Sequence, residues 1–307
     1  MENWSHKIMK QKSATVVFFG SGPVAARSLE LLAQDFEIEA VITKPKPLHH
    51  KGTFPVLDIA EKLSLKILST ANKKDLKELF KNSSLKSTLG VVIDYGIIIP
   101  KEVISYFPLG IVNSHFSLLP RWRGADPITY SVLKGDQETG VSLMLIVEAL
   151  DEGPLLKQEP INLGRDMDSK ELTEKLILLS DRMLKQTLPE YFNGSLSQSS
   201  QPSRGVTYSS KLSKSDGVLD FNKSAEELER EIRAYKEWPR SRTDINGQPV
   251  IITKAHVKGG SDKPGSIYRD NKEFGIYTAN GILIVDKLIP HGKKEMDSVS
   301  YLSGYSV

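Results

Sequence analysis

The sequence predicts an α/β fold: a doubly wound, mainly parallel sheet followed by a small C-terminal β-barrel. Short apolar runs alternate with amphipathic segments over residues 14–192, which is the rhythm of parallel strands joined by crossover helices. Residues 193–204 are rich in Ser, Asn and Gln and read as a linker. Short strands with Asn and Gly turns over 205–307 indicate the barrel, and the polar residues 1–13 indicate a disordered N-terminal extension.

The first strand, Ala14–Phe19, ends at a glycine-rich turn. The turn Gly20–Ala25 matches the pattern G-x-G-x-x-A of dinucleotide-binding folds, and Pro23 suits the first turn of the following helix. That pattern also requires an acidic residue about twenty positions later, to bind the ribose. The second strand instead ends in Thr43–Lys46, which has no acidic residue. We therefore favour a tight turn open to another ligand over a nicotinamide dinucleotide site.

The remaining elements follow from hydrophobic periodicity and from turn residues. In the first domain we expect strands at 38–43, 65–68, 90–93, 109–112 and 141–147, and helices at 56–63, 73–81, 127–134 and 167–192. In the C-terminal domain we expect a helix at 224–235 and strands around 244–248, 250–252, 275–278 and 281–285.

Two basic segments are candidates for contact with nucleic acid. The loop Lys44–Thr53 carries three lysines, and it either touches phosphate or is simply solvated. The adjacent His49 and His50 within this loop point apart and have no carboxylate nearby, so a metal site is disfavoured. The segment Arg230–Arg242 places five basic residues around Trp238, which suits either an RNA surface or a solvated helix face.

Polar residues follow three of the predicted strands, at Gly20–Gly22, Asp94–Gly96 and Asn113–His115. Ligands of doubly wound sheets bind outside the carboxyl ends of the strands, so we expect all three segments to face one crevice. Asn113 and His115 are two apart and share a face of their strand. An amide that donates to an oxyanion and an imidazole that moves a proton suit carbonyl chemistry, although turn and capping roles explain either residue alone.

The composition excludes several classes of protein. The 307 residues carry a net charge of +3 and no cysteine, which rules out disulfides, thiolate nucleophiles and cysteine-ligated zinc. This weak basicity permits a nucleic-acid partner without requiring one. The sequence has no run of about 18 apolar residues, and its first residues lack the apolar core of a secretory signal. We expect a cytoplasmic monomer with no membrane or metal partner.

These motifs resemble those of the formyltetrahydrofolate-dependent transferases. The shared pattern is Asn113-Ser114-His115, then Ser117–Pro120 and Arg123-Gly124, and later Leu150–Gly153. Further similarity lies at Asp94–Gly96, Glu138–Val141, Pro120–Ile128, Lys211–Ser215, Ile232–Tyr235, Trp238–Pro239, Asn246–Pro249 and Gly292–Lys294. The C-terminal matches make the members that act on methionyl-tRNA the most similar.

The resemblance implies a Rossmann-like catalytic domain and an OB-like barrel that binds tRNA. It implies transfer of the formyl group of 10-formyltetrahydrofolate, the co-substrate, to the α-amine of initiator methionyl-tRNA, for translation initiation. Asn113 and His115 would stabilise the oxyanion, and Asp151 would keep His115 charged or accept the amine proton. Folate would contact Asp94, Tyr95, Gly96, Ser117, Leu118, Leu119 and Pro120. The tRNA would contact Lys44, Lys46, Lys51, Arg233, Lys236 and Arg240.

Two departures from the family pattern concern the acceptor. Val24 stands where the tRNA enzymes usually carry an aromatic residue near the methionine side chain, and the loop Lys44–Thr53 is shorter than usual. Two alternatives therefore stay open: formylation of an amino sugar nucleotide by the same centre, and an RNA-binding homologue without catalysis. The intact set of Asn113, His115 and Asp151 argues against the second alternative.

Overall fold

The computed structural model describes residues 14–46, 52–270 and 273–305, arranged in two compact units. Unit 1 contains the chain up to Arg123 together with Gly140–Pro160 and Lys175–Thr207. Unit 2 contains Gly124–Thr139, Ile161–Glu174 and the chain from Tyr208 onward. The expected N-terminal extension, His49, His50 and Lys51 lie outside the described residues.

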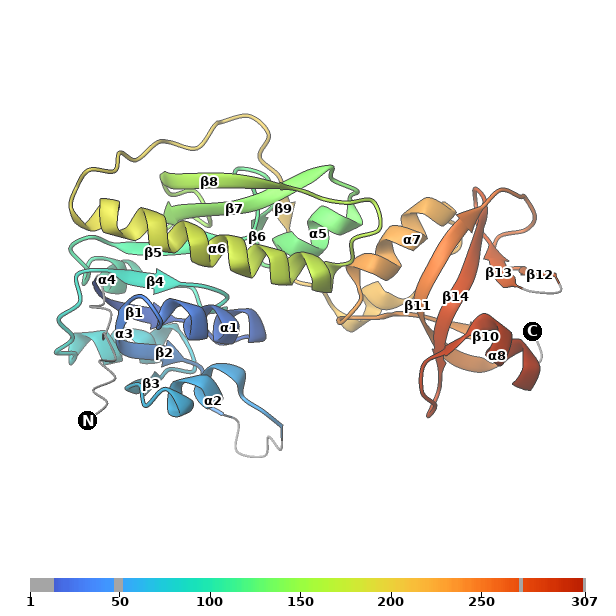
Figure 1. The fold of residues 1–307 in the computed structure, drawn as a ribbon, viewed down its shortest axis with the longest axis horizontal. Coiled ribbons are helices and arrows are strands. Elements are labelled where there is room, and N and C mark those ends of the chain that lie inside the picture. Colours follow the sequence, from blue (N-terminus) through green and yellow to red (C-terminus); the bar gives the residue numbers. More distant parts are fainter. Residues whose placement is uncertain (1–13, 47–51, 271–272, 306–307) are drawn as a thin grey trace, which may run out of the picture. The chain divides into compact units, whose positions relative to one another are not determined.

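Unit 1 is built on a sheet whose strand order is β3-β2-β1-β4-β5-β7-β8 (Figure 1). The first five strands in this order pair in parallel, and β7 joins β5 antiparallel. This arrangement confirms the predicted doubly wound, mainly parallel sheet. The strands are β1 Thr15–Phe19, β2 Glu37–Thr43, β3 Ile67–Ser69, β4 Gly90–Val92, β5 Ile111–His115, β7 Glu138–Leu145 and β8 Leu155–Asn162.

Helices cover both faces of this sheet. They are α1 Pro23–Leu32, α2 Pro55–Lys62, α3 Lys73–Lys81, α4 Lys101–Ile104 and α6 Ser169–Phe192. On one face, Phe19 of β1 packs with Phe80 of α3 and Val103 of α4 in one apolar cluster. On the other face, Ser114 of β5 meets Ser180 of α6. Residues 193–204, which follow α6, lie in unit 1.

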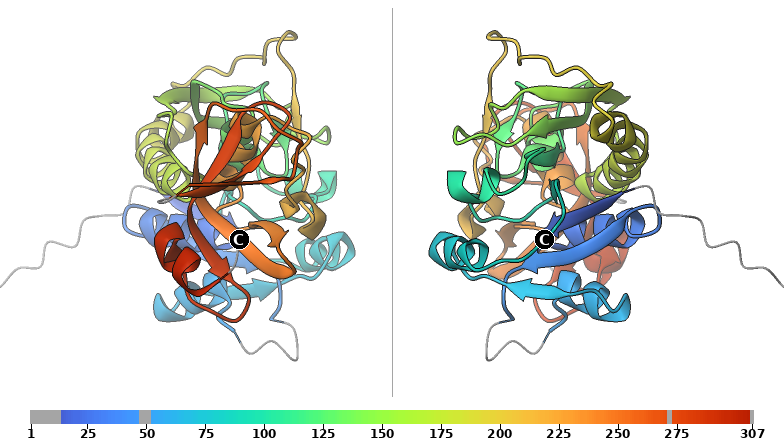
Figure 2. Two further views of the ribbon diagram at one scale, coloured as in Figure 1. Left: turned by 90° about the vertical axis from the view of Figure 1, so that its right-hand side faces the viewer. Right: turned by 90° about the vertical axis from the view of Figure 1, so that its left-hand side faces the viewer.

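Unit 2 centres on an antiparallel sheet of order β10-β11-β14-β13-β12, with β15 added on β14. The sheet bends into a half-barrel, which can be followed from two sides in Figure 2. Its strands are β10 Ser241–Ile245, β11 Gln248–Lys258, β12 Ile267–Arg269, β13 Phe274–Tyr277, β14 Ile282–Pro290 and β15 Met296–Asp297. The turn between β10 and β11 is Asn246-Gly247, and both residues have positive φ, as a two-residue hairpin requires.

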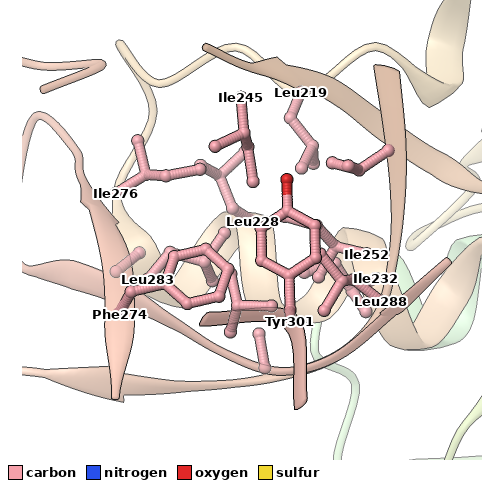
Figure 3. Close-up of a cluster of buried hydrophobic side chains, with 14 residues drawn as sticks. Leu219, Leu228, Ile232, Ile245, Ile252, Phe274, Ile276, Leu283, Leu288 and Tyr301 are labelled. Atoms are coloured by element: carbon pink, nitrogen blue, oxygen red, sulfur yellow. The ribbon is translucent and has the colours of Figure 1, made fainter. Parts of the chain in front are cut away.

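The apolar side of the half-barrel packs on helix α7, Ala225–Ala234, and helix α8, Ser298–Gly304. Leu228 and Ile232 of α7 join Phe274, Leu283 and Tyr301 in one buried cluster (Figure 3). The capping box of Ser224 and Glu227 fixes the start of α7. Short elements complete the fold: β6 Arg123–Gly124, α5 Pro127–Leu133, β9 Tyr208–Ser209 and the 3₁₀ turn Lys214–Gly217. In the described ranges, no helix has the length and apolarity to cross a membrane.

Candidate active site

Strand β5 presents Asn113 and His115 on the same face of the sheet. The intervening Ser114 points to the opposite face, where its hydroxyl lies 2.6 Å from that of Ser180 on α6. Asn113 is half-buried and lies between Val92 of β4 and Met144 of β7. Side chains alternate along a strand, so the amide and the imidazole both belong to the face away from α6. The predicted pairing of these two groups on one face is therefore present.

His115 is held through both of its ring nitrogens. Nε2 lies 2.9 Å from the carbonyl oxygen of Trp122, and Nδ1 lies 3.8 Å from Oδ2 of Asp151. A carbonyl oxygen only accepts, so Nε2 carries the donated hydrogen. The other ring nitrogen, Nδ1, faces the carboxylate. Only 6% of the His115 side chain and 12% of the Asp151 side chain are exposed, so water screens this pair weakly.

The loop between β7 and β8 delivers Asp151 to the imidazole. Asp151 has a φ of +52°, in the left-handed region that non-glycine residues seldom occupy. Two residues later, a Cβ on Gly153 would lie 1.7 Å from the carbonyl oxygen of Leu145, so only glycine fits there. Trp122, whose carbonyl binds His115, also has a positive φ of +58°. Strained backbone of this kind concentrates at functional sites, which supports the assignment of this region.

The glycine-rich turn after β1 does not form a dinucleotide site. The backbone N–H groups of Ser21 and Gly22 approach the carbonyl oxygen of Asp94 at 3.0 and 3.4 Å. The carboxylate of Asp94 lies against Gly22, where a Cβ would be 1.9 Å from Oδ2. In dinucleotide folds this turn binds a pyrophosphate through such amides. Here an anionic pyrophosphate would be repelled by the Asp94 carboxylate, and the backbone amides are already bonded to the Asp94 carbonyl. These contacts exclude a dinucleotide site at this turn.

The turn Asp94–Gly96 follows β4 at the same edge of the sheet. Asp94 and Gly96 are exposed, whereas the side chain of Tyr95 is buried with its hydroxyl 2.6 Å from that of Thr70. Burial raises the pKa of Tyr95 to about 12, against the opposing effect of the Thr70 hydrogen bond. The Tyr95 carbonyl accepts from the hydroxyl of Ser21, so a ligand at this turn would meet Asp94 and Gly96 rather than Tyr95. The ammonium group of Lys44 lies over Gly96, 2.8 Å from the position of a Cβ there.

The segment Ser117–Pro120 is a rigid turn fixed by two side chains from neighbouring strands. The hydroxyl of Ser142 donates to the carbonyl of Ser117 and accepts from the N–H of Leu119, at 2.6 and 3.0 Å. The amide of Gln158 donates to the carbonyl of Leu119 at 2.8 Å. Ser117, Leu119 and Pro120 are buried and Leu118 is half-buried. The turn therefore presents mainly Leu118 and backbone to a ligand.

Sequence comparisons identify the family of this fold and site. Residues 13–188 match the model of the formyl transferase family, and residues 211–306 match that of the formyl transferase C-terminal domain. The chain belongs to the formyl transferase family. Relatives over nearly the full length are methionyl-tRNA formyltransferases. That of Myxococcus xanthus is 35% identical and that of Roseiflexus castenholzii is 33% identical, with 95% of this chain and at least 95% of each relative covered.

Solved structures share the formyl transferase fold at lower identity. An N-formyltransferase from Helicobacter canadensis, in complex with folinic acid and dTDP-3-aminofucose, superposes with a TM-score of 0.68 at 18% identity, over 92% of this chain and 99% of that one. HypX from Aquifex aeolicus, in complex with tetrahydrofolic acid, has a TM-score of 0.63 at 14% identity, over 94% of this chain and 46% of that one. These likenesses concern the fold alone.

The basic residues singled out for tRNA contact have different surroundings in this formyl transferase. Arg233 is largely buried, and its guanidinium binds Glu229 at 2.6 Å and the carbonyl of Met167 at 2.9 Å. The ammonium of Lys236 donates to the carbonyl of Thr253 at 3.0 Å. Arg240 is half-exposed, and Lys46 is exposed. Arg233 and Lys236 thus have structural partners within unit 2, which the basic spacing in the sequence did not reveal.

Sequence reasoning missed several groups that form hydrogen bonds within the candidate site. They are the Trp122 carbonyl, the hydroxyl of Ser142, and the amides of Gln158 and Gln201. Backbone carbonyls leave no trace in a sequence pattern. Gln201 lies in a Ser- and Gln-rich stretch that reads as a linker, so no signal there pointed to a specific contact.

We expect Gly153→Ala to disturb the Asp151 loop. The added Cβ must displace the Leu145 carbonyl or the loop itself, at a cost of about 2 kcal/mol of unfolding free energy. Gly164→Ala is the matched control, because the nearest atom to its Cβ is 3.8 Å away. Denaturant titration and kcat measurements should show a loss for Gly153→Ala alone. Equal stability and activity of the two variants would contradict this account of the loop.

Proposed function

We propose that the protein transfers the formyl group of 10-formyltetrahydrofolate to the α-amine of methionyl-tRNA, the reaction that prepares the initiator for translation. The observation that carries the proposal is the His115–Asp151 pair beside Asn113, on a chain that aligns over its length with methionyl-tRNA formyltransferases. The relatives at 33–35% identity that support the tRNA acceptor align over nearly the whole chain, the half-barrel of unit 2 included.

The residues around the sheet edge fit a folate donor. Asp94 and Gly96 of the turn are exposed, and Ile98 just beyond it is 71% exposed. Leu150, next to Asp151, is 60% exposed. The ion pair of Lys101 with Glu148, at 3.6 Å, joins the two segments that carry these side chains. Exposed apolar groups beside the exposed polar residue Asp94 suit a flat heterocycle with hydrogen-bonding edges.

The site residues supply what amide formation from a formyl donor needs. The α-amine of the methionyl ester attacks the formyl carbon, and the negative charge develops on the formyl oxygen. The Asn113 amide and the charged His115 stabilise that oxyanion. Asp151 keeps His115 protonated at Nδ1, or accepts the amine proton directly or through water. The bond from the formyl carbon to N10 then breaks, and the proton ends on N10 of tetrahydrofolate.

A comparison of acceptors tests the proposed function. The protein and 10-formyltetrahydrofolate are offered methionyl-tRNA, other aminoacyl-tRNAs and dTDP-linked amino sugars in parallel assays. We expect kcat/KM for methionyl-tRNA to exceed the others by at least about 10²-fold, because a site built for one side chain rejects others to this extent. Faster turnover of the amino sugar would favour the alternative function, formylation of an amino sugar nucleotide, since a sugar formyltransferase shares the fold. Absence of transfer to every acceptor would favour an RNA-binding homologue.

Arg240 is the basic residue of unit 2 that we propose for contact with tRNA phosphate. It is half-exposed and lies two residues from Trp238, which is 54% exposed. We expect Arg240→Ala to raise KM for tRNA severalfold and to reduce the dependence of log KM on log salt by about 0.7–0.9, with kcat unchanged. Arg233→Ala removes the same charge but breaks the Glu229 pair, so it should lower stability and leave the salt slope unchanged. Identical salt slopes for both variants and the wild type would overturn this assignment.

A further inference from the structure

The segment 199–207 crosses the candidate site as an extended strap within unit 1. Ser199 exchanges two backbone hydrogen bonds with Leu155, at 2.7 and 2.9 Å, just after the Asp151 loop. At its other end, the hydroxyl of Thr207 accepts from the N–H of Trp122 at 2.9 Å, and the Thr207 carbonyl accepts from the N–H of Arg123 at 2.9 Å. The strap therefore forms hydrogen bonds both next to the loop that carries Asp151 and with the backbone segment whose Trp122 carbonyl accepts from His115.

Gln201 joins these two places through one side chain. Its Nε2 donates to the carbonyl of Asp151 at 2.7 Å and to that of Gly153 at 2.9 Å. Its Oε1 accepts from the guanidinium of Arg123, whose closest nitrogen is 2.8 Å away. An amide is the one uncharged side-chain group that donates twice and accepts from a cation at the same time. Gln201 thus satisfies the carbonyls of a strained loop and a buried cation together.

Arg123 connects this amide to the imidazole acceptor. The residue directly follows Trp122, whose carbonyl binds Nε2 of His115. The Arg123 side chain is 9% exposed, and its guanidinium also pairs with Glu152 at 2.9 Å. Glu152 in turn adjoins Asp151. The result is a ring of contacts: His115, the Trp122 carbonyl, Arg123, Gln201 and the Asp151 backbone.

We propose that Gln201 is a positioning residue that holds Asp151 opposite Nδ1 of His115. The Asp151 backbone is in the left-handed conformation, whose free-energy cost for a non-glycine residue is offset by surrounding contacts. The amide of Gln201 supplies one such contact, to the Asp151 carbonyl itself. Groups that orient a catalytic pair in this way are worth about 10–100-fold in activity by comparison with outer-shell residues of metal sites. The expected effect of Gln201 on kcat rests on the proposed function. The restraint of the Asp151 loop by Gln201 rests on the structure alone.

Gln201→Glu is the most informative variant. It is nearly isosteric and keeps the acceptor for Arg123, but it replaces the double donor by an oxygen that faces two carbonyls. Gln186→Glu is the matched control, because Gln186 is an exposed amide of unit 1 that lies on α6. We expect Gln201→Glu to lower kcat about tenfold to a hundredfold, with KM for the folate donor within about threefold of the wild type. Gln201→Asn, which keeps both amide functions on a shorter stem, should recover part of kcat.

Coupling to Asp151 separates a positioning role from a general structural one. In an Asp151→Asn background, Gln201→Glu should reduce kcat by less than about twofold, because the group that it positions is already lost. A full and independent loss in both backgrounds would overturn the proposal. So would wild-type kcat in Gln201→Glu.

Amide hydrogen exchange tests the restraint without any turnover. We expect exchange at residues 150–154 to accelerate at least fivefold in Gln201→Glu and to stay unchanged in Gln186→Glu, at equal Tm. Unchanged exchange in Gln201→Glu would overturn the positioning role even in an active enzyme. If the wild-type protein transfers no formyl group, the proposed function fails, and the exchange experiment still decides whether Gln201 holds the loop.

Discussion

Replacement of His115 by Ala is expected to lower kcat for formyl transfer about 10³-fold, within the 10²–10⁴ range of a positioned acid–base group. The variant loses a side chain that contacts both the Trp122 carbonyl and the Asp151 carboxylate at the strand end. KM for the folate donor should change little, since the imidazole acts on the reacting carbonyl rather than on the ring system. Steady-state assays at saturating tRNA measure the effect.

His256→Ala is the matched control for this change. His256 also pairs with an aspartate, Asp286 at 2.9 Å, but its side chain is 51% exposed on the half-barrel. Its removal should leave kcat within about twofold of the wild type. Because loss of a buried imidazole leaves a cavity, His115→Gln serves as a second variant with a filled site. Turnover near the wild-type rate in either His115 variant, in a folded protein, would show that His115 takes no part in formyl transfer.

Asp151→Asn is expected to lower kcat about 10²-fold, by loss of the charge that stabilises the imidazolium and accepts protons. The shape of the side chain is conserved, so the strained loop and its contacts with Gln201 should persist. Asp286→Asn is the matched control, because it also removes an aspartate carboxylate paired with a histidine, His256. It should leave kcat unchanged. Single-turnover kinetics with excess donor separate this chemical effect from tRNA release. Equal rates for Asp151→Asn and the wild type would show that the carboxylate has no part in transfer.

The sequence predicted the strand that carries the candidate site and every other strand of the sheet except β8, Leu155–Asn162. Short apolar runs predicted β1, β4 and β5, because strands buried on both faces appear in the sequence as continuous hydrophobic segments. The period of two placed Asn113 and His115 on one face, and the Ser114–Ser180 contact on the other face agrees with it. Helix α8 and strands β12 and β15 were not predicted, because these short elements are stabilised by packing against the half-barrel rather than by their own periodicity.

Long-range partners account for what the sequence could not predict in the site. The spacing of Arg233 suggested a surface for RNA, yet Glu229 one turn earlier neutralises it. The turn after β1 was expected to be open to a ligand other than a nicotinamide dinucleotide, yet the carboxylate of Asp94, distant in the chain, lies against Gly22. The family pattern pointed to Asp151, but its distance from His115, 36 positions away in the chain, and its contact with Gln201, 50 positions away, come from the structure. Contacts between such distant positions follow from the tertiary fold, so local patterns carry no sign of them.

A double-mutant comparison tests most directly whether His115 and Asp151 act as one catalytic unit. The measurement is the single-turnover rate of formyl transfer to methionyl-tRNA for the wild type, His115→Ala, Asp151→Asn and the double variant. If Asp151 acts through the imidazole, the double variant should be no more than about threefold slower than His115→Ala alone. Rate losses that multiply, to about 10⁵-fold in the double variant, would show two independent groups and would contradict the paired centre.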